Sequence, residues 1–308
     1  MFFKFCQILV AVFMAIASLF TPSQTIPPTP PENVGINVNP NPIADAVTYH
    51  DLKTMSFNVK ISGEGLQSND LRLPRVVKMI EKYGADSIGV QEADKWWTDS
   101  LEEALPQYAR VGTYRDDGIS LGESCSIFYL KDKYELLDSG TFWLSETPDT
   151  PSWGWDTACP RIATYAILRC KESGFVYAHF NTHFDHVGTV ARQESVPLLA
   201  SRIAEIAPDI PVVLTGDFNA SEGSDIYLRL LSCGLKDTKS MAEKHDDCAT
   251  YHGYNPFTPA TKPIDFIFVN GYCSSVKSST VDTNMIGLIY PSDHFPVITE
   301  LTLFNGGK

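Results

Sequence analysis

Six short segments of the 308-residue sequence each place polar side chains at the end of a predicted β-strand. Strand ends are rigid positions from which residues far apart in the chain can meet in one constellation. Together the segments offer carboxylates, carboxamides and imidazoles. The residues are Asn58 in SFNVK, Glu92 in GVQEAD, His183 in NTHFDH, Asp217 and Asn219 in LTGDFNA, Asp265 in PIDFIFV, and Asp293 and His294 in PSDHFPV.

These side-chain types suit the hydrolysis of a phosphate ester. The reaction needs a nucleophilic water, compensation for the charge that builds on phosphorus, and help for the leaving oxygen. A carboxylate can orient and deprotonate the water, and an imidazole held by a neighbouring carboxylate can compensate charge. Hard oxygen ligands favour Mg²⁺, and Mn²⁺ accepts the same ligands. We therefore expect a Mg²⁺-dependent site that Mn²⁺ could also occupy.

Taken singly, each residue has an ordinary structural explanation. Glu92 could be a solvated loop acid, and Asn58 could satisfy a buried backbone group. His183 could be a hydrogen-bonded core histidine, and Asp217 could simply belong to a turn. The order and local context of the whole set favour the functional interpretation.

The elements that must position these residues alternate irregularly between strands and helices. Hydrophobic periodicity predicts helices over residues 71–83 and 188–206 and several runs of neighbouring strands, a pattern typical of two packed sheets with helices outside. A strand followed by an acidic turn occurs twice, in SIGVQE and in PVVLTGD. Two similar halves would bring Glu92 and Asp217 to the same edge of a sandwich.

GDFN followed by a C-terminal SDHFPV resembles the endonuclease/exonuclease/phosphatase superfamily, to which pancreatic deoxyribonuclease belongs. The likeness spans roughly residues 47–303. The segments LLDSGTFWLSETPD and GWDTACPRIATYAIL resemble an exported, bacterial-type branch of that superfamily. The resemblance implies an α/β fold, a four-layer α/β/β/α sandwich of two mixed sheets with helices on the outer faces.

The resemblance also implies which residues hold the metal. Glu92 would be the principal ligand, and Asn58 and Asp293 would lie near the ion.

The same resemblance implies the catalytic roles. Asp217 would position or deprotonate the attacking water, and Asn219 would hold the phosphate beside it. His183 and His294 would contact the phosphoryl oxygens, and Asp265 would orient His294.

Two further residues are weaker candidates for substrate binding. Arg161 begins a predicted strand after Cys159 and Pro160 and could offer its guanidinium fork to a phosphate, although a surface salt bridge explains it equally well. Asp185 lies two residues after His183, so strand alternation would turn it to the same side.

The N-terminal 46 residues are expected to lie outside the fold. Residues 1–20 have the pattern of a secretory signal peptide, with Lys4, an apolar run and the small residues Ala15 and Ala17. A retained membrane anchor is the alternative, but the apolar run is shorter than the roughly 20 residues that a span requires. The proline-rich residues 21–46 predict a linker. The catalytic domain would occupy residues 47–308 of a secreted or periplasmic protein without stable membrane insertion after signal cleavage.

Composition limits the partners. The formal net charge of −13 does not favour nucleic acid as a substrate, since phosphate backbones are normally bound by clustered Lys and Arg. A bound cation could still supply positive charge locally, so nuclease chemistry is not excluded. Six of the seven cysteines follow the predicted signal; this even number permits disulfides but fixes no pairing. Protein partners are unknown from the sequence.

We therefore predict a metal-dependent phosphoesterase that hydrolyses phosphodiester bonds by attack of an activated water. A nuclease, including a 3′–5′ exonuclease-like enzyme, is one form of it. Two alternatives stay open: a phosphomonoesterase acting on sugar, inositol or nucleotide phosphates, and a non-catalytic secreted binding protein that retains the fold.

Overall fold

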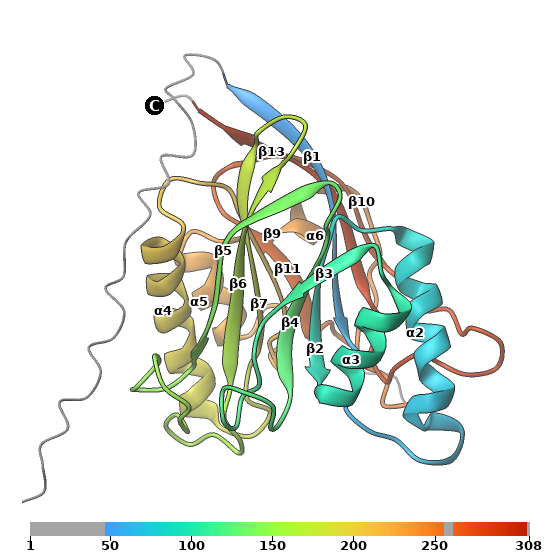
Figure 1. Ribbon diagram of the computed structural model, residues 1–308. Helices are drawn as coiled ribbons and strands as arrows, with labels where there is room; N and C mark the ends of the chain where they lie inside the picture. Colours follow the sequence, from blue (N-terminus) through green and yellow to red (C-terminus); the bar gives the residue numbers. More distant parts are fainter. Residues whose placement is uncertain (1–46, 256–260, 307–308) are drawn as a thin grey trace, which may run out of the picture. The chain divides into compact units, whose positions relative to one another are not determined.

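Two β-sheets pack face to face in the computed structural model, and helices cover the outer face of each sheet (Figure 1). The structure describes residues 47–255 and 261–306. The expected four-layer α/β/β/α sandwich is confirmed. The predicted signal peptide and linker, residues 1–20 and 21–46, lie outside the described residues.

Both sheets mix parallel and antiparallel strands. In spatial order, the seven-stranded sheet contains β10 (Ala242–His245), β12 (Cys273–Val281), β13 (Val297–Asn305), β1 (Thr48–Asn58), β2 (Ser87–Ala93), β4 (Ser124–Leu130) and β3 (Tyr108–Val111). The six-stranded sheet contains β5 (Tyr134–Trp143), β6 (Ile162–Cys170), β7 (Val176–His183), β8 (Val212–Asp217), β11 (Asp265–Val269) and β9 (Lys236–Asp237). The pairs β1–β2 and β7–β8 are parallel and lie in the interior of their sheets.

Two long helices follow the hydrophobic periodicity closely. Helix α2 (Asn69–Tyr83) ends at Gly84, whose φ of 54° is a left-handed conformation that glycine adopts without strain. Helix α4 (Thr189–Ile206) runs through Pro197, although proline removes one backbone hydrogen bond inside a helix. Packing of the buried Val196 and Leu199 against the six-stranded sheet outweighs this loss.

Helix α3 (Lys95–Ala104) is a helix that the sequence interpretation did not predict. The carboxylate of Asp94 accepts a hydrogen bond from the Trp97 N–H and caps its first turn. Trp97 is fully buried against the seven-stranded sheet. The remaining helices are short: a 3₁₀ turn (Gly65–Gln67), α5 (Asp225–Ser232) and α6 (Thr238–Met241).

Three apolar layers hold the sandwich together. Between the sheets, Ile127 and Leu301 meet Tyr177 and Val213 from the opposite sheet. Outer layers join α2 and α3 to the seven-stranded sheet, and α4 and α5 to the six-stranded sheet. Burying one large apolar side chain stabilises the fold by about 1.5–3 kcal/mol, so these layers supply most of the favourable free energy.

One end of the inter-sheet layer is polar instead. The Gln91 Nε2 atom donates to Asn181 Oδ1 at 2.6 Å, and Asn181 donates to the carbonyl of Val90 at 2.9 Å. His179 places its two ring nitrogens 2.9 Å from Ser87 Oγ and 2.9 Å from Thr215 Oγ1. Buried polar groups are tolerated only when hydrogen-bonded, so this network fixes how the two sheets face each other.

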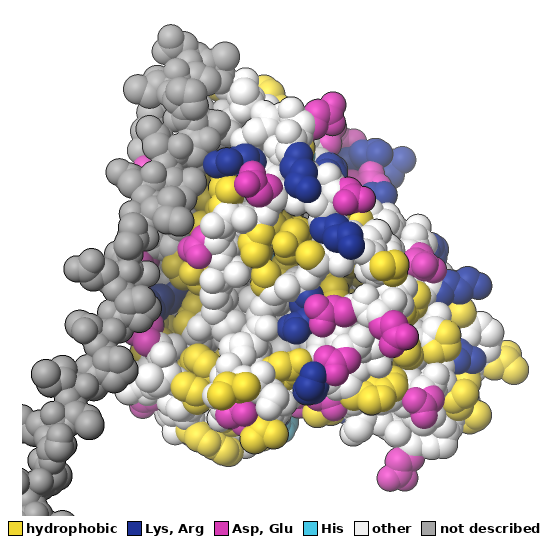
Figure 2. All heavy atoms as spheres, in the orientation of Figure 1, with side chains coloured by type: hydrophobic (Ala, Val, Ile, Leu, Met, Phe, Trp, Pro, Cys, Tyr) yellow, Lys and Arg dark blue, Asp and Glu magenta, His cyan; other side chains and the backbone are white. Residues whose placement is uncertain are grey.

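Acidic and basic side chains are interspersed on the surface. On the face in Figure 2, Lys and Arg lie among Asp and Glu and form no continuous basic stripe. The cysteines of the described residues are free. Within the described residues, no helix is long and apolar enough to cross a membrane.

Replacing Gly89 by alanine should destabilise the protein strongly. A Cβ atom at this position would lie 1.9 Å from Thr215 Oγ1 and 2.6 Å from Asn181 Oδ1, so the polar network would have to break. We expect Gly89→Ala to lower the free energy of unfolding by at least about 2 kcal/mol, measured by urea denaturation. Gly271→Ala is the matched control, since nothing lies within 4 Å of its added Cβ. Similar stabilities for the two variants would contradict the close approach of the sheets.

Stability should also fall in acid because of His179. Burial lowers the pKa of His179 to about 3, so the folded protein keeps the ring neutral while the unfolded chain takes up a proton below about pH 6.5. The neutral His179 ring therefore makes its full contribution to the free energy of unfolding above that pH. This contribution is lost as the pH falls toward 3, at about 1.4 kcal/mol per pH unit.

The variant His179→Gln should remove this part of the slope. The free energy of unfolding, measured by urea denaturation between pH 7.5 and pH 4.5, should depend less on pH in the variant. The pKa values of His183 and His252 are also lowered by burial, but both residues remain in each protein and cancel in the comparison. Equal slopes would refute the assignment.

Candidate active site

The central strands of both sheets bring their ends to one edge of the sandwich. Asn58 ends β1, and His183 ends β7 beside Asp217 at the end of β8. Strand β11 runs antiparallel to β8, so its first residue, Asp265, pairs with Asp217. Parallel strands present their carboxyl ends at a common edge, which is where ligands bind in many α/β proteins.

A cleft of about 440 Å³ opens at this edge. The structure brings together all of the residues singled out from the sequence, in two groups. Those that line the cleft are Glu92, Arg161, His183, Asp217, Asn219, Asp293 and His294. The other three, Asn58, Asp185 and Asp265, are buried, and each hydrogen-bonds to a residue that lines it.

Backbone irregularity turns Glu92 into the cleft. Strand alternation places Gln91 between the sheets, and would turn Glu92 toward the outer, helix-covered face, where Val90 lies. The register of β2 shifts between Val90 and Ala93, and Glu92 has a φ of 58°. Bulges of this kind re-aim side chains next to active sites. Lys60 and Asn219 are also left-handed, with φ of 60° and 46°.

Asn58 joins the carboxylates that the two sheets contribute. Its Nδ2 atom donates to Glu92 Oε1 at 2.9 Å and to Asp217 Oδ2 at 3.1 Å. Its Oδ1 atom accepts the backbone N–H of Lys60 at 3.0 Å. Asn58 is fully buried, so these bonds satisfy an amide that would otherwise be costly to bury.

Asp217 and His294 have strongly shifted pKa values. Burial, followed by the charge of Asp265, raises the pKa of Asp217 to about 7. Burial disfavours the charged form of His294, but Asp265 and Asp217 outweigh it and raise the pKa of His294 to about 10. At neutral pH His294 is therefore an imidazolium, whose Nδ1–H donates to Asp265 Oδ2 at 2.9 Å. Its Nε2 atom lies 3.7 Å from Asp217 Oδ2.

His183 is neutral, in contrast to His294. Burial, together with the positive charges of Arg161 and His294, lowers the pKa of His183 well below its usual value. The 3.5 Å approach of its Nε2 atom to Asp217 Oδ2 is therefore no ion pair at neutral pH. Asn219 Nδ2 lies 3.1 Å from the same nitrogen and also donates to the carbonyl of Phe184 at 3.0 Å, which fixes the carboxamide beside the ring.

Asp185 lies behind Arg161 and holds it in place. Its Oδ2 atom accepts from Arg161 Nε at 3.1 Å, and its Oδ1 atom accepts the backbone N–H groups of Val187 and Gly188. Arg161 Nη2 is 2.9 Å from His186 Nδ1. Both partners of the Arg161–Asp185 pair are buried, with side-chain exposures of 4% and 1%. Arg161 thus presents the remainder of its guanidinium to the cleft.

The acidic part of the cleft fits a divalent cation. Glu92 and Asp293 both line it, and Lys60 Nζ lies 3.4 Å from Asp293 Oδ2. Burial would lower the pKa of Lys60, but the charges of Asp293 and Glu92 outweigh burial and raise it. An ammonium group drawn to these carboxylates shows that this region stabilises positive charge. Carboxylate oxygens are also the ligands that Mg²⁺ prefers.

Asp217, Asp265 and His294 form a second group able to hold a metal. One ligand atom of each lies within 4.8 Å of the others. All three side chains are buried. Asp265 and His294 already hydrogen-bond to each other, whereas Glu92 and Asp293 present carboxylates to the cleft.

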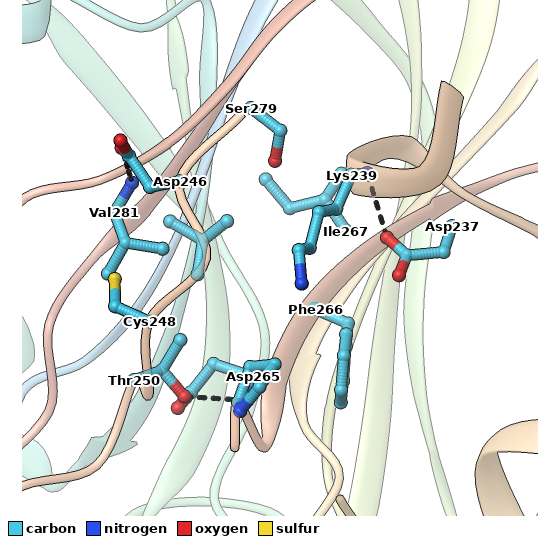
Figure 3. Close-up of a pocket in the computed structure, with 12 residues that line it drawn as sticks. Asp237, Lys239, Asp246, Cys248, Thr250, Asp265, Phe266, Ile267, Ser279 and Val281 are labelled. Carbon is cyan, nitrogen blue, oxygen red and sulfur yellow. Dashed lines mark hydrogen bonds between the residues drawn. The ribbon is translucent and has the colours of Figure 1, made fainter. Parts of the chain in front are cut away.

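Asp265 also lines a second, smaller cavity (Figure 3). This cavity measures about 20 Å³ and is lined in part by Lys239 and Cys248. Thr250 Oγ1 accepts the backbone N–H of Asp265 at 3.1 Å. Among the described residues, Asp265 Oδ1 has no hydrogen-bond partner, so the carboxylate is held on its active-site side by His294.

Among the cleft residues that the sequence interpretation did not select are Lys60, Arg115 and Tyr251. Lys60 follows Asn58 by two positions in SFNVK, so strand alternation could have indicated it. Arg115 and Tyr251 lie in loops without a recognisable motif. The Tyr251 ring centroid is 4.9 Å from that of His294, which only the folded chain reveals.

Comparisons with known proteins agree with this geometry. The model of the endonuclease/exonuclease/phosphatase family matches residues 55–294. A solved structure of a protein of that family from Bacteroides thetaiotaomicron is 34% identical, with a TM-score of 0.80, covering 83% of this chain and 99% of its own. A mannosyl-6-phosphatase from Bacteroides thetaiotaomicron is 35% identical, with a TM-score of 0.78, covering 81% of this chain and 99% of its own.

Curated relatives are matched over smaller shares of their own length. Nocturnin from Drosophila melanogaster is 32% identical over 171 residues, which is 52% of this chain and 25% of that protein. The chain spans between 25% and 66% of the length of the first three curated relatives it matches.

Removing the charge of Asp265 should lower the pKa of His294. In Asp265→Asn the main favourable partner of the imidazolium is lost, so the pKa of about 10 should fall markedly when the ring is titrated by NMR. Asp237→Asn is the control, because it removes a buried carboxylate that bonds to Tyr227 and not to His294. A His294 ring that titrates identically in Asp265→Asn and the wild type would contradict the assigned electrostatics.

Proposed function

Because the chain belongs to the endonuclease/exonuclease/phosphatase family, we propose that it is a metal-dependent hydrolase of phosphate esters that uses an activated water. One observation carries this proposal: Asp217, Asn219 and the Asp265–His294 pair converge in one cleft that Glu92 and Asp293 also line. Several carboxylates and imidazoles held together at a buried site are costly for stability, and function is the physical reason for that arrangement.

Asp217 is the residue best suited to take a proton from the attacking water. A general base works best when its pKa lies close to the working pH, and burial raises the pKa of Asp217 to about 7. The backbone N–H of Asn219 donates to Asp217 Oδ1 at 3.0 Å. The other oxygen, Oδ2, faces the imidazoles of His183 and His294. The second carboxylate oxygen is therefore the proton acceptor.

Positive groups of the chain compensate the charge that develops on phosphorus. The imidazolium of His294 is kept protonated by Asp265 and lines the cleft. Arg161 adds a guanidinium that is held by Asp185 and by His186. The neutral His183 contributes a hydrogen-bonding ring rather than charge. A divalent cation bound at Glu92 and Asp293 would add Lewis-acid stabilisation of the phosphoryl and leaving oxygens.

A small phosphomonoester is the substrate class that we place first. The cleft combines its cationic groups with the carboxylates Glu92, Glu123 and Asp293, which would repel the flanking phosphates of a polynucleotide. No basic stripe forms on the face shown in Figure 2. The similarity to a mannosyl-6-phosphatase at 35% identity supports this choice.

Phosphodiester hydrolysis, as predicted from the sequence, is the second candidate. It is supported by the similarity to nocturnin and to a bovine 2′,5′-phosphodiesterase 12, which is 25% identical over 282 residues. Export of the protein stays a prediction, carried by the signal-like pattern of residues 1–20 and the proline-rich residues 21–46.

Purified protein with Mg²⁺ should hydrolyse a panel of phosphate esters, and EDTA should abolish turnover until Mg²⁺ is restored. Asp217→Asn should lower kcat by about 10²–10⁴-fold because the proton acceptor is lost. Thermal unfolding should be measured alongside, since Asn58 and Asn219 donate to different oxygens of Asp217 and asparagine keeps only one acceptor oxygen. Glu135→Gln, on an exposed side chain of β5, is the control and should behave as the wild type.

The panel should include p-nitrophenyl phosphate, hexose phosphates, bis-p-nitrophenyl phosphate, RNA and DNA. Faster turnover of the monoesters supports the first substrate class, and faster turnover of the diesters supports the second. Absence of turnover on every ester would overturn the proposed function and favour a binding protein that retains the fold.

A further inference from the structure

Two residues that line the cleft, Arg115 and Glu123, have no part in the chemistry described above. Arg115 and Glu123 line the cleft together with Arg161. Arg115 Nη1 donates to Glu123 Oε2 at 2.6 Å. We call Arg115, Glu123 and Arg161 the charged wall. None of the sequence motifs includes Arg115. The wall exists only because two loops meet at the cleft, one between β3 and β4 with Arg115 and Glu123, and one between β5 and β6 with Arg161.

The Arg115–Glu123 pair is fixed in place by its loop. The backbone N–H of Arg115 donates to the carbonyl of Glu123 at 2.9 Å, and Trp143 Nε1 donates to the carbonyl of Arg115 at 2.7 Å. At the loop tip, one carboxylate oxygen of Asp117 accepts three successive backbone N–H groups, those of Ile119, Ser120 and Leu121. A loop so thoroughly hydrogen-bonded can hold side chains in a defined geometry.

The pair is also largely removed from solvent. Side-chain exposures are 16% for Arg115 and 12% for Glu123. Each side chain keeps bonding capacity toward the cleft. No hydrogen bond within the described residues takes up Glu123 Oε1, Arg115 Nη2 or Arg161 Nη1. The wall therefore offers one carboxylate acceptor beside two guanidinium donors.

Such a wall selects a neutral polyhydroxylated group. A second phosphate would meet the Glu123 carboxylate, and a cationic ligand would meet both guanidinium groups, so each suffers repulsion. A hydroxyl group both donates and accepts hydrogen bonds. Two neighbouring hydroxyls can therefore donate to Glu123 and accept from Arg115 or Arg161, and such bonds to charged groups are the stronger ones.

We propose that the charged wall binds the hydroxyl groups of the alcohol that the cleft releases, so that the preferred substrate is the phosphate ester of a sugar or similar polyol. This inference rests on the proposed phosphoesterase function and deepens it. Glu123 and Arg115 are specificity-determining residues here, and they bind the part of the substrate that remains after the phosphate is removed.

A matched pair of substrates tests the inference with the wild-type protein. Hexose 6-phosphate and cyclohexylmethyl phosphate share a six-membered ring and a primary phosphate ester, but only the first carries ring hydroxyls. We expect kcat/KM to favour the hexose ester by at least about 100-fold, because sites built to bond hydroxyls strongly reject analogues that lack them. Comparable values for the two esters would overturn the inference while leaving the proposed function intact, and absence of turnover on all esters would overturn both.

Variants then test the assigned residues. Glu123→Gln should raise KM for the hexose ester by about 10-fold or more and reduce kcat far less, because the bonds to the leaving alcohol are made before the chemical step. The preference for the hexose ester over cyclohexylmethyl phosphate should fall by the same factor. Glu135→Gln, an exposed glutamate on β5, should keep the wild-type preference. Equal losses on both esters in Glu123→Gln would show a structural role and refute the assignment.

Discussion

The site is organised around the buried carboxylate of Asp217. Both sheets contribute to its surroundings: Asn58 donates to it from the seven-stranded sheet, and the backbone of Asn219 donates to it from the loop that follows β8. Two imidazoles, those of His183 and His294, approach the same oxygen within 4 Å. Placing this charge away from water is tolerable only with these partners, and so every strand that supplies one of them is constrained by it.

The polar layer between the sheets explains how the partners meet. Alternation along β7 turns His179, Asn181 and His183 toward the seven-stranded sheet. Alternation along β8 turns Thr215 and Asp217 toward the same sheet. The active site is therefore the open end of a hydrogen-bonded layer that continues into the sandwich. The same bonds that fix the separation of the sheets also fix the distances between the polar groups that line the cleft.

Conflicting charges within one cleft give the residues distinct protonation states. Asp265 keeps His294 protonated, whereas His183, next to Arg161 and His294, is kept neutral. Burial and the neighbouring charge of Asp265 also raise the pKa of Asp217 to about 7, close to neutral pH. Common side chains thus supply a carboxylate that titrates near neutral pH, an imidazolium and an uncharged imidazole, because their environments differ.

The sequence by itself determined the layered fold and the candidate residues, because periodicity reports which face is buried and short motifs report which polar groups end the strands. It could not show how the Glu92 side chain reaches the cleft, since alternation would turn that side chain outward and a bulge reverses it. It also could not assign Asn58 as the link between two carboxylates or find Arg115 beside Glu123. Those relations join positions far apart in the chain, and only packing of one sheet on the other, with the loops around them, decides which of those groups come within hydrogen-bonding distance.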